Sequence, residues 1–157
     1  KAESKLIEDG FTPSKFNLIE GDFFSVYSKL FSNKKFDLIL GNPPFIRYQD
    51  FPEEQRNKAL QILEDYGFHP NKLTNAWLFF LLISVRLLNE KGRIAMVIPA
   101  ELLQVKYAAE ARLFLSKFFN SITLLTFKKL VFEGIQQEVV LLLGDKKSGN
   151  KGIDLLS

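Results

Sequence analysis

Phe36-Asp37-Leu38-Ile39-Leu40-Gly41-Asn42-Pro43-Pro44-Phe45 is the stretch around which the rest of the chain is organised. A short apolar run leads directly into Asn-Pro-Pro-Phe. Neither proline can donate to a sheet ladder or lie inside a helix, and the residue before each is pushed toward extended geometry. The backbone therefore leaves the predicted strand stiffly, with the amide of Asn42 and the ring of Phe45 held close together.

Composition limits the kinds of site that the chain can carry. Its 157 residues suffice for one domain with a core, and its net charge of +3 permits a nucleic-acid partner without requiring one. Because there is no Cys and only one His, His69, we expect no metal centre, no cysteine nucleophile and no histidine triad. No secretory signal is visible, and the apolar run 75–89 is short for a membrane span. We therefore expect a cytoplasmic protein without a membrane partner.

Hydrophobic periodicity predicts alternating strands and helices. The predicted strands are 16–20, 36–40, 93–99, 121–127 and 138–144, and the predicted helices are 1–10, 23–31, 52–66, 75–89 and 101–119. This alternation predicts an α/β fold with a parallel sheet covered by helices. The almost wholly apolar 36–40 strand should be covered on both faces, and the 101–119 helix should bury Leu102, Val105, Ala109 and Leu113.

Three distinctive loops follow predicted strands. Asp22 follows the first strand, Asn42 to Phe45 follow the second, and Pro99-Ala100-Glu101 ends the third. Ligands of open parallel sheets bind beyond the carboxyl ends of the strands. We therefore expect these loops to meet at one edge of the sheet and to form a single site.

Asn42 and Pro43 offer a specific chemistry at that edge. The carboxamide oxygen of Asn42 and the carbonyl of Pro43 can each accept from one N–H of an exocyclic amine. Holding both protons turns the amine lone pair out of the ring plane, toward an electrophile. Phe45 can stack on the ring that carries the amine, which is worth about 1–3 kcal/mol for a nucleobase. Positioning of this kind needs no strong base.

Leu40 to Phe45 resembles the Asn/Asp-Pro-Pro-aromatic motif of S-adenosylmethionine-dependent amino methyltransferases that act on adenine. Further segments resemble this family in the same order, so the resemblance covers nearly all of the chain: 20–24, 74–80, 85–88, 92–103, 131–132 and 138–141. The resemblance implies a Rossmann-like methyltransferase sheet, mostly parallel with an antiparallel C-terminal strand. It also implies the modification half of a restriction-modification system, with S-adenosylmethionine as cofactor and DNA as partner.

The resemblance implies that four residues contact the target base. Asn42 and the Pro43 carbonyl would accept from the adenine N6 amine. Phe45 would stack on the flipped adenine, and Phe132 would hold its other face or edge. The motif often has Tyr where this chain has Phe45, which keeps the stacking face and loses the hydroxyl.

The resemblance assigns four further residues to the cofactor. Asp22 would bond the cofactor's adenine amine, Phe23 and Phe80 would flank that ring, and Pro44 would line the approach of the methyl donor. Simpler interpretations compete with two of these roles. Asp22 is also well placed as a helix N-cap, and Phe80 lies in an apolar helix where a Phe is usually core.

The chain departs from the family at its N-terminal end. We find no Gly-rich turn for the methionine end of the cofactor, and no acidic residue for its ribose, upstream of Glu20. We therefore expect residues 1–157 to be an N-terminally incomplete part of a methyltransferase catalytic domain, inactive alone. The parent chain would carry a specificity or nuclease region. Three alternatives stay open: an RNA adenine methyltransferase, a protein glutamine methyltransferase, and a catalytically idle binding or scaffold fragment.

Overall fold

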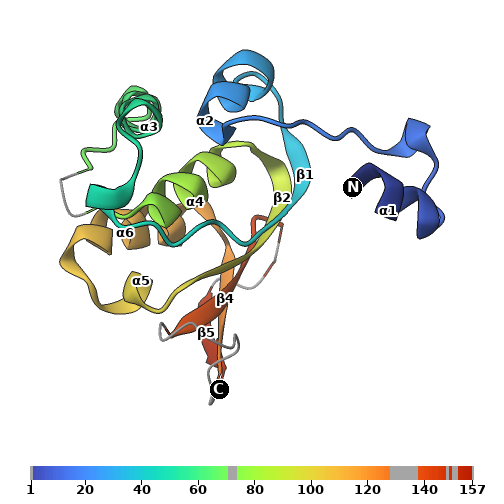
Figure 1. Cartoon of the computed structure of the whole chain (residues 1–157). Helices are drawn as coiled ribbons and strands as arrows, with labels where there is room; N and C mark the ends of the chain where they lie inside the picture. The colour runs from blue at the N-terminus through green and yellow to red at the C-terminus, as the bar shows by residue number, and fades with distance from the viewer. Residues whose placement is uncertain (1, 71–73, 128–137, 148, 150–151, 157) are drawn as a thin grey trace.

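The computed structural model (Figure 1), which describes residues 2–70, 74–127, 138–147, 149 and 152–156, contains a mixed five-stranded sheet. The spatial order of the strands is β1-β2-β4-β3-β5. Their bounds are β1 Phe36–Gly41, β2 Leu88–Pro99, β3 Ser121–Thr126, β4 Val139–Asp145 and β5 Gly152–Leu156. Since β1 pairs with β2 in parallel, β3 with β5 in parallel, and β4 with both neighbours antiparallel, only β4 is reversed. The predicted mostly parallel α/β sheet with an antiparallel C-terminal strand is confirmed.

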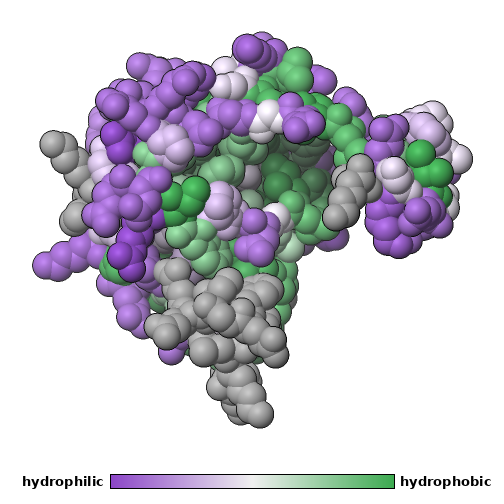
Figure 2. Space-filling view, viewed as in Figure 1, coloured by the Kyte–Doolittle hydropathy of each residue, from purple (hydrophilic) through white to green (hydrophobic). Residues whose placement is uncertain are grey.

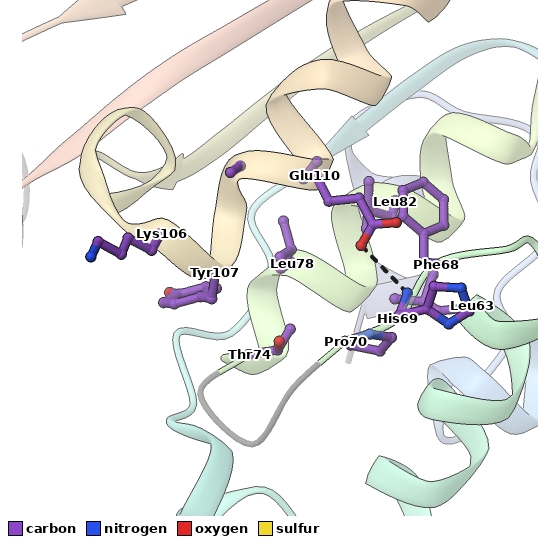
Figure 3. Close-up of a pocket in the computed structure, with 12 residues that line it drawn as sticks. Leu63, Phe68, His69, Pro70, Thr74, Leu78, Leu82, Lys106, Tyr107 and Glu110 are labelled. Carbon is purple, nitrogen blue, oxygen red and sulfur yellow. Dashed lines mark hydrogen bonds between the residues drawn. The ribbon is translucent and has the colours of Figure 1, made fainter.

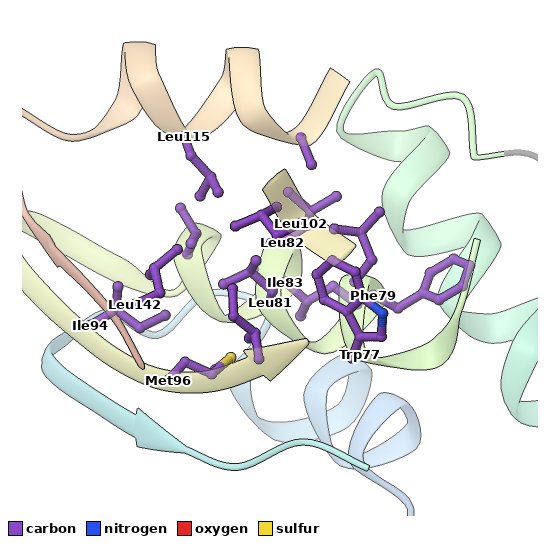
Figure 4. Close-up of a cluster of buried hydrophobic side chains, with 14 of the residues drawn as sticks. Trp77, Phe79, Leu81, Leu82, Ile83, Ile94, Met96, Leu102, Leu115 and Leu142 are labelled. Atoms are coloured by element: carbon purple, nitrogen blue, oxygen red, sulfur yellow. The ribbon is translucent and has the colours of Figure 1, made fainter. Parts of the chain in front are cut away.

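Helix α4 forms the apolar centre of the fold. Nine of its eleven residues are buried, because the sequence AWLFFLLISVR is apolar around its whole circumference. Figure 4 shows Leu81, Leu82 and Ile83 between the strands and Leu115 of α6.

The helical segments are α1 Ala2–Glu8, η1 Pro13–Lys15, α2 Phe23–Val26, η2 Tyr27–Phe31, η3 Tyr48–Asp50, α3 Glu53–Asp65, α4 Ala76–Arg86, α5 Glu101–Gln104, η4 Lys106–Ala108 and α6 Ala109–Phe118. Within the described residues, no helix has the length and apolar character that a membrane crossing requires.

The predicted strand at 16–20 is wrong. These residues lie in an arm that leads from α1 to α2 and pair with no described strand (Figure 1). Leu18 and Ile19 are 48% and 41% exposed. A strand exists only where its N–H and C=O groups find a neighbouring backbone, and an alternating pattern alone does not supply one.

The prediction that the 36–40 strand is covered on both faces is also wrong. Leu38 and Leu40 of β1 are 54% and 68% exposed. Among the described residues, the sheet buries alternate positions such as Ile94, Met96 and Ile98 of β2 against the helices. Leu40 pairs with Ala95 and therefore points to the opposite face of the sheet. Apolar composition indicated burial on both faces, whereas the described helices supply it on one.

The predicted helix over 101–119 is interrupted at Val105. This residue is extended, with φ −77° and ψ 143°, and separates α5 from η4 and α6. Arg112 donates to the carbonyl of Leu102 at 2.8 Å and to that of Val105 at 2.9 Å, and the Val105 carbonyl also accepts from the amide of Ala108 at 3.3 Å. The break shifts the buried side of α6 to Ala111 and Leu115, and Leu113 is 55% exposed. The predicted apolar face was therefore correct at Leu102 but not at Ala109 or Leu113, which are exposed.

Candidate functional site

Asn42 to Phe45 leave the carboxyl end of β1, where the sequence predicted them. Because β1 and β2 are parallel and Gly41 pairs with Met96, this end lies at the same edge as the end of β2. Pro43 is buried and Phe45 is half-buried against the core, whereas Asn42 and Pro44 are exposed. The carboxamide of Asn42 makes no hydrogen bond to any residue that the structure describes. Its oxygen is thus free to accept from a ligand, on a backbone that the prolines stiffen.

The backbone that follows Phe45 is tied to the start of α4. The amide of Ala76 donates to the carbonyl of Ile46 at 2.9 Å, and the amide of Tyr48 donates to Oδ1 of Asn75 at 3.1 Å. Arg56 donates to the carbonyl of Tyr48 at 3.2 Å, and its guanidinium lies 4.7 Å from the centre of the Tyr48 ring. Four contacts therefore fix the loop immediately after the Asn-Pro-Pro-Phe turn.

The structure brings Asp22, Phe23 and Phe80 into one cluster. Asp22 caps α2, because its Oδ2 accepts from the amide of Ser25 at 2.8 Å. The ring centres of Phe23 and Phe80 are 4.9 Å apart, with an angle of 33° between their planes. Since the two half-buried rings touch each other, a third ring would have to lie against their exposed edges. Asp22 thus acts as a helix cap and Phe80 packs against a neighbouring ring, as the simpler interpretations of these residues predicted. The other carboxylate oxygen of Asp22, Oδ1, makes no hydrogen bond to a described residue.

A hollow with an apolar floor lies beside β1, between the body of the protein and the arm that carries α1 (Figure 2). The arm and β1 both carry exposed apolar side chains: Leu18, Ile19, Leu38 and Leu40. Phe132, the residue predicted to hold the other side of the base, lies outside the described residues.

Sequence reasoning missed a polar cluster beside the loop. Asn75 Nδ2 donates to Glu101 Oε2 and to Tyr107 Oη, each at 3.3 Å, and Tyr107 Oη donates to the same carboxylate oxygen at 2.7 Å. Burial and the bond to Glu101 raise the pKa of the Tyr107 phenol above its ordinary value. Asn75 precedes an apolar helix and was expected to act as part of that helix. Its side chain makes no cap bond and faces the loop instead.

Tyr107 also lines a cavity of about 260 Å³ between α4, α6 and the segment that follows α3 (Figure 3). Apolar side chains of Phe68, Leu78 and Leu82 form much of its wall. The backbone N–H of His69 donates to Oε2 of Glu110 at 3.4 Å, which links the two sides. Asn42 is not part of the cavity lining, whereas Tyr107 belongs both to the lining and to the polar cluster.

Comparison with known proteins gives one family and several relatives. The model of the family described as Eco57I restriction-modification methylase matches residues 3–132. The type II methyltransferase M.AccI of Acinetobacter calcoaceticus is 32% identical over 101 residues, which cover 63% of this chain and 18% of that protein. The type II methyltransferase M.HincII of Haemophilus influenzae is 28% identical over 145 residues, which cover 87% of this chain and 28% of that protein. The chain therefore spans less than a third of the length of these relatives.

Solved structures share the fold. The methyltransferase subunit of a type I restriction-modification system from Streptococcus thermophilus matches with a TM-score of 0.74 and 18% identity, covering 98% of this chain and 32% of that one. The enzyme of a DrdV–DNA complex matches with a TM-score of 0.58 and 18% identity, covering 76% of this chain and 14% of that one. A Listeria monocytogenes protein assigned to the class I S-adenosylmethionine-dependent methyltransferases matches with a TM-score of 0.53 and 15% identity, covering 78% of this chain and 36% of that one. At these identities the likeness establishes the fold alone.

Proposed function

Because the chain belongs to the Eco57I restriction-modification methylase family, we propose that residues 1–157 are part of the catalytic domain of an S-adenosylmethionine-dependent methyltransferase. Its acceptor is the N6 amine of adenine in DNA, within a restriction-modification system. The observation that carries the proposal is the exposed carboxamide of Asn42, which makes no hydrogen bond to the described residues and stands on a stiff turn at the carboxyl end of β1. The DNA complex among the similar structures supports this choice of acceptor.

Asn42 and the Pro43 carbonyl orient the amine. Each accepts one N–H of N6, which turns the nitrogen lone pair out of the adenine plane. Phe45 stacks on the base and offsets part of the cost of extruding it from the duplex. As the new N–C bond forms, positive charge develops on N6, and the two acceptor oxygens stabilise that charge until one proton leaves to solvent. The chain thus contributes positioning and electrostatics rather than a strong base.

The aromatic cluster fits the adenine end of the cofactor. Phe23 and Phe80 offer flat apolar edges, and Asp22 keeps Oδ1 available for an exocyclic amine while Oδ2 caps α2. When bound, S-adenosylmethionine would supply the methyl group from its sulfonium centre: the bond from sulfur to the methyl carbon would break as the N–C bond forms, and a neutral thioether would leave. Pro44, exposed beside Asn42, lines the approach to the amine. We infer that the remaining cofactor contacts, a target-recognition region and any nuclease region belong to a longer parent chain, since the relatives are more than three times as long as the matched part.

The test is methyl transfer by the parent protein with labelled S-adenosylmethionine. Asn42→Ala should lower turnover on DNA by about a hundredfold or more while changing the Kd of the cofactor less than about twofold, because Asn42 holds the acceptor. The matched control is Asn33→Ala, which removes an exposed Asn from the turn before β1 and should leave both values unchanged. An equal loss of cofactor affinity in Asn42→Ala would mean that Asn42 is mainly structural.

The same assay separates the competing functions. Single-stranded and duplex DNA, RNA, and a glutamine-containing peptide are offered in parallel. Transfer to duplex DNA, with the label recovered as N6-methyladenine, supports the proposal. Transfer only to RNA or to the peptide overturns the DNA assignment. Calorimetry with S-adenosylmethionine identifies an idle binding module, because such a protein would show neither cofactor binding nor transfer in its parent form.

A further inference from the structure

Asn75 joins three segments that are distant in the sequence. Its Oδ1 accepts from the amide of Tyr48, in the loop that follows Asn42 to Phe45. Its Nδ2 donates to Glu101, just after β2, and to Tyr107 in η4. The hydroxyl of Tyr107 completes the triangle by donating to Glu101. Side chains from the segment between β2 and α6 therefore hold Asn75, and Asn75 holds the backbone of the catalytic loop at Tyr48.

We propose that Asn75, Glu101 and Tyr107 form a polar clamp that sets the position of the Asn42–Phe45 loop for methyl transfer. The proposal rests on the proposed function of that loop. None of the three residues is placed against the acceptor or the cofactor, so they are positioning residues. Tyr48 is the point at which the clamp acts on the loop, only three residues after Phe45.

The donors and acceptors of the clamp match in one arrangement. Oδ1 of Asn75 is engaged by an N–H, so its amide nitrogen must face the other way, toward oxygen. A carboxylate can only accept, and Glu101 receives one N–H from Asn75 and the O–H of Tyr107. The phenol oxygen in turn accepts the second N–H of Asn75. Because each proton has one acceptor, the clamp resists rotation of Asn75 and keeps Oδ1 aimed at Tyr48.

This complementarity predicts the effect of an isosteric change. Asn75→Asp replaces the donating nitrogen with an oxygen that faces the Glu101 carboxylate at the 3.3 Å contact. Two carboxylates at that distance repel each other, so the side chain is expected to turn away from Glu101 and release Tyr48. Adding Glu101→Gln restores a donor opposite the new acceptor. The double variant should therefore regain most of the kcat that the single variant loses.

The first test measures kinetics in the parent enzyme. Asn75→Asp should lower kcat on duplex DNA at least tenfold with a less than twofold change in the Kd of S-adenosylmethionine, and the Asn75→Asp/Glu101→Gln double variant should regain most of kcat. Asn33→Asp, in an exposed turn, is the matched control and should behave like the wild type. An unchanged kcat in Asn75→Asp, or a double variant as slow as the single one, would overturn the clamp.

The second test does not depend on activity. Exchange of the Tyr48 amide proton is followed by NMR in the wild type and in Asn75→Ala, where that proton loses its acceptor. We expect at least tenfold faster exchange at Tyr48, with little change at buried amides of β2. An unchanged Tyr48 rate would overturn the clamp even if kcat fell. If the wild-type parent transferred no methyl group to DNA, the proposed function would fail, while the exchange rates would still show whether Asn75 holds the loop.

Discussion

Gly144, in the middle of the sheet, is the position where one added methyl group tests the packing most sharply. A Cβ at Gly144 would lie 2.8 Å from Cζ and 2.9 Å from both Cε atoms of Phe119, a ring that is 5% exposed. The same change at Gly41, directly before Asn42, would meet only the terminal methyl of Met96 at 3.3 Å. Gly152 of β5 has no atom within 4 Å of its added Cβ. Alanine at the three positions therefore forms a graded series.

The expected magnitudes follow from these distances. At Gly144 the ring tip must retreat by about half an ångström to reach ordinary contact, in a core packed at crystal-like density. Overpacking of this kind costs about 1–3 kcal/mol, and the lower backbone entropy of the unfolded Ala chain returns about 0.4–1 kcal/mol. We expect Gly144→Ala to lower the free energy of unfolding by about 1–2 kcal/mol. Gly41→Ala and Gly152→Ala should stay within about 0.5 kcal/mol of the wild type, because a Met tip moves easily and Gly152 is open.

Urea unfolding of the 157-residue chain, followed by circular dichroism, measures this series at constant m-value. Shortening the facing ring should partly rescue the tight position, so Phe119→Leu should cost less in the Gly144→Ala background than alone. The reasoning would be refuted if Gly144→Ala unfolded at the same urea concentration as Gly152→Ala. It would also be refuted if the effects of Gly144→Ala and Phe119→Leu were additive, since the clash would then lie elsewhere.

Three further predictions concern the elements around the site. Burial and the hydrogen bond to Glu101 raise the pKa of the Tyr107 phenol above 10.0, so its contribution to stability is complete below pH 10 and is lost as the pH rises further. The free energy of unfolding should therefore fall less steeply with pH above pH 10 in Tyr107→Phe than in the wild type. Equal slopes in the two proteins would contradict this. Phe51 is 2% exposed and packs on α2 and α4, so Phe51→Ala should cost about 3–5 kcal/mol and Phe51→Leu clearly less in urea titrations. Arg112→Ala removes the donor of the Leu102 carbonyl and one of the two donors of the Val105 carbonyl, so it should cost about 1–3 kcal/mol, against less than about 0.5 kcal/mol for the exposed Lys117→Ala. An equally small cost in both variants would contradict this role of Arg112.

Local sequence predicted the elements whose cause is local. The two prolines after Gly41 end β1 where they stand, whatever surrounds them. The length of the apolar run 75–89 favoured a buried helix over a strand, and α4 is such a helix over Ala76–Arg86. The family resemblance rested on such contiguous segments. It was confirmed by a family model that spans residues 3–132.

Features that need a partner elsewhere in the chain were not predicted. The alternating pattern at 16–20 has no described strand beside it, so it does not form a ladder. No proline or glycine marks the helix break at Val105 in the sequence. Arg112, seven residues further along the chain, donates to the Val105 carbonyl and so stabilises the break. Leu38 and Leu40 are exposed because the described helices cover the other face of the sheet, and the apolar composition of a strand does not predict which face the helices cover.

The sequence by itself determined the chemistry of the loop: a carboxamide, a carbonyl and an aromatic ring on a proline-stiffened strand end. Only the tertiary structure decided how that loop is held. The clamp joins Tyr48 to Asn75 across 27 positions and Asn75 to Glu101 across 26. Tyr48 and Glu101 come close because they follow β1 and β2, which are parallel and end at the same edge of the sheet, and Asn75 at the start of α4 bonds to both. Their hydrogen bonds depend on which donor faces which acceptor there, and no local pattern of apolar and polar residues specifies that pairing.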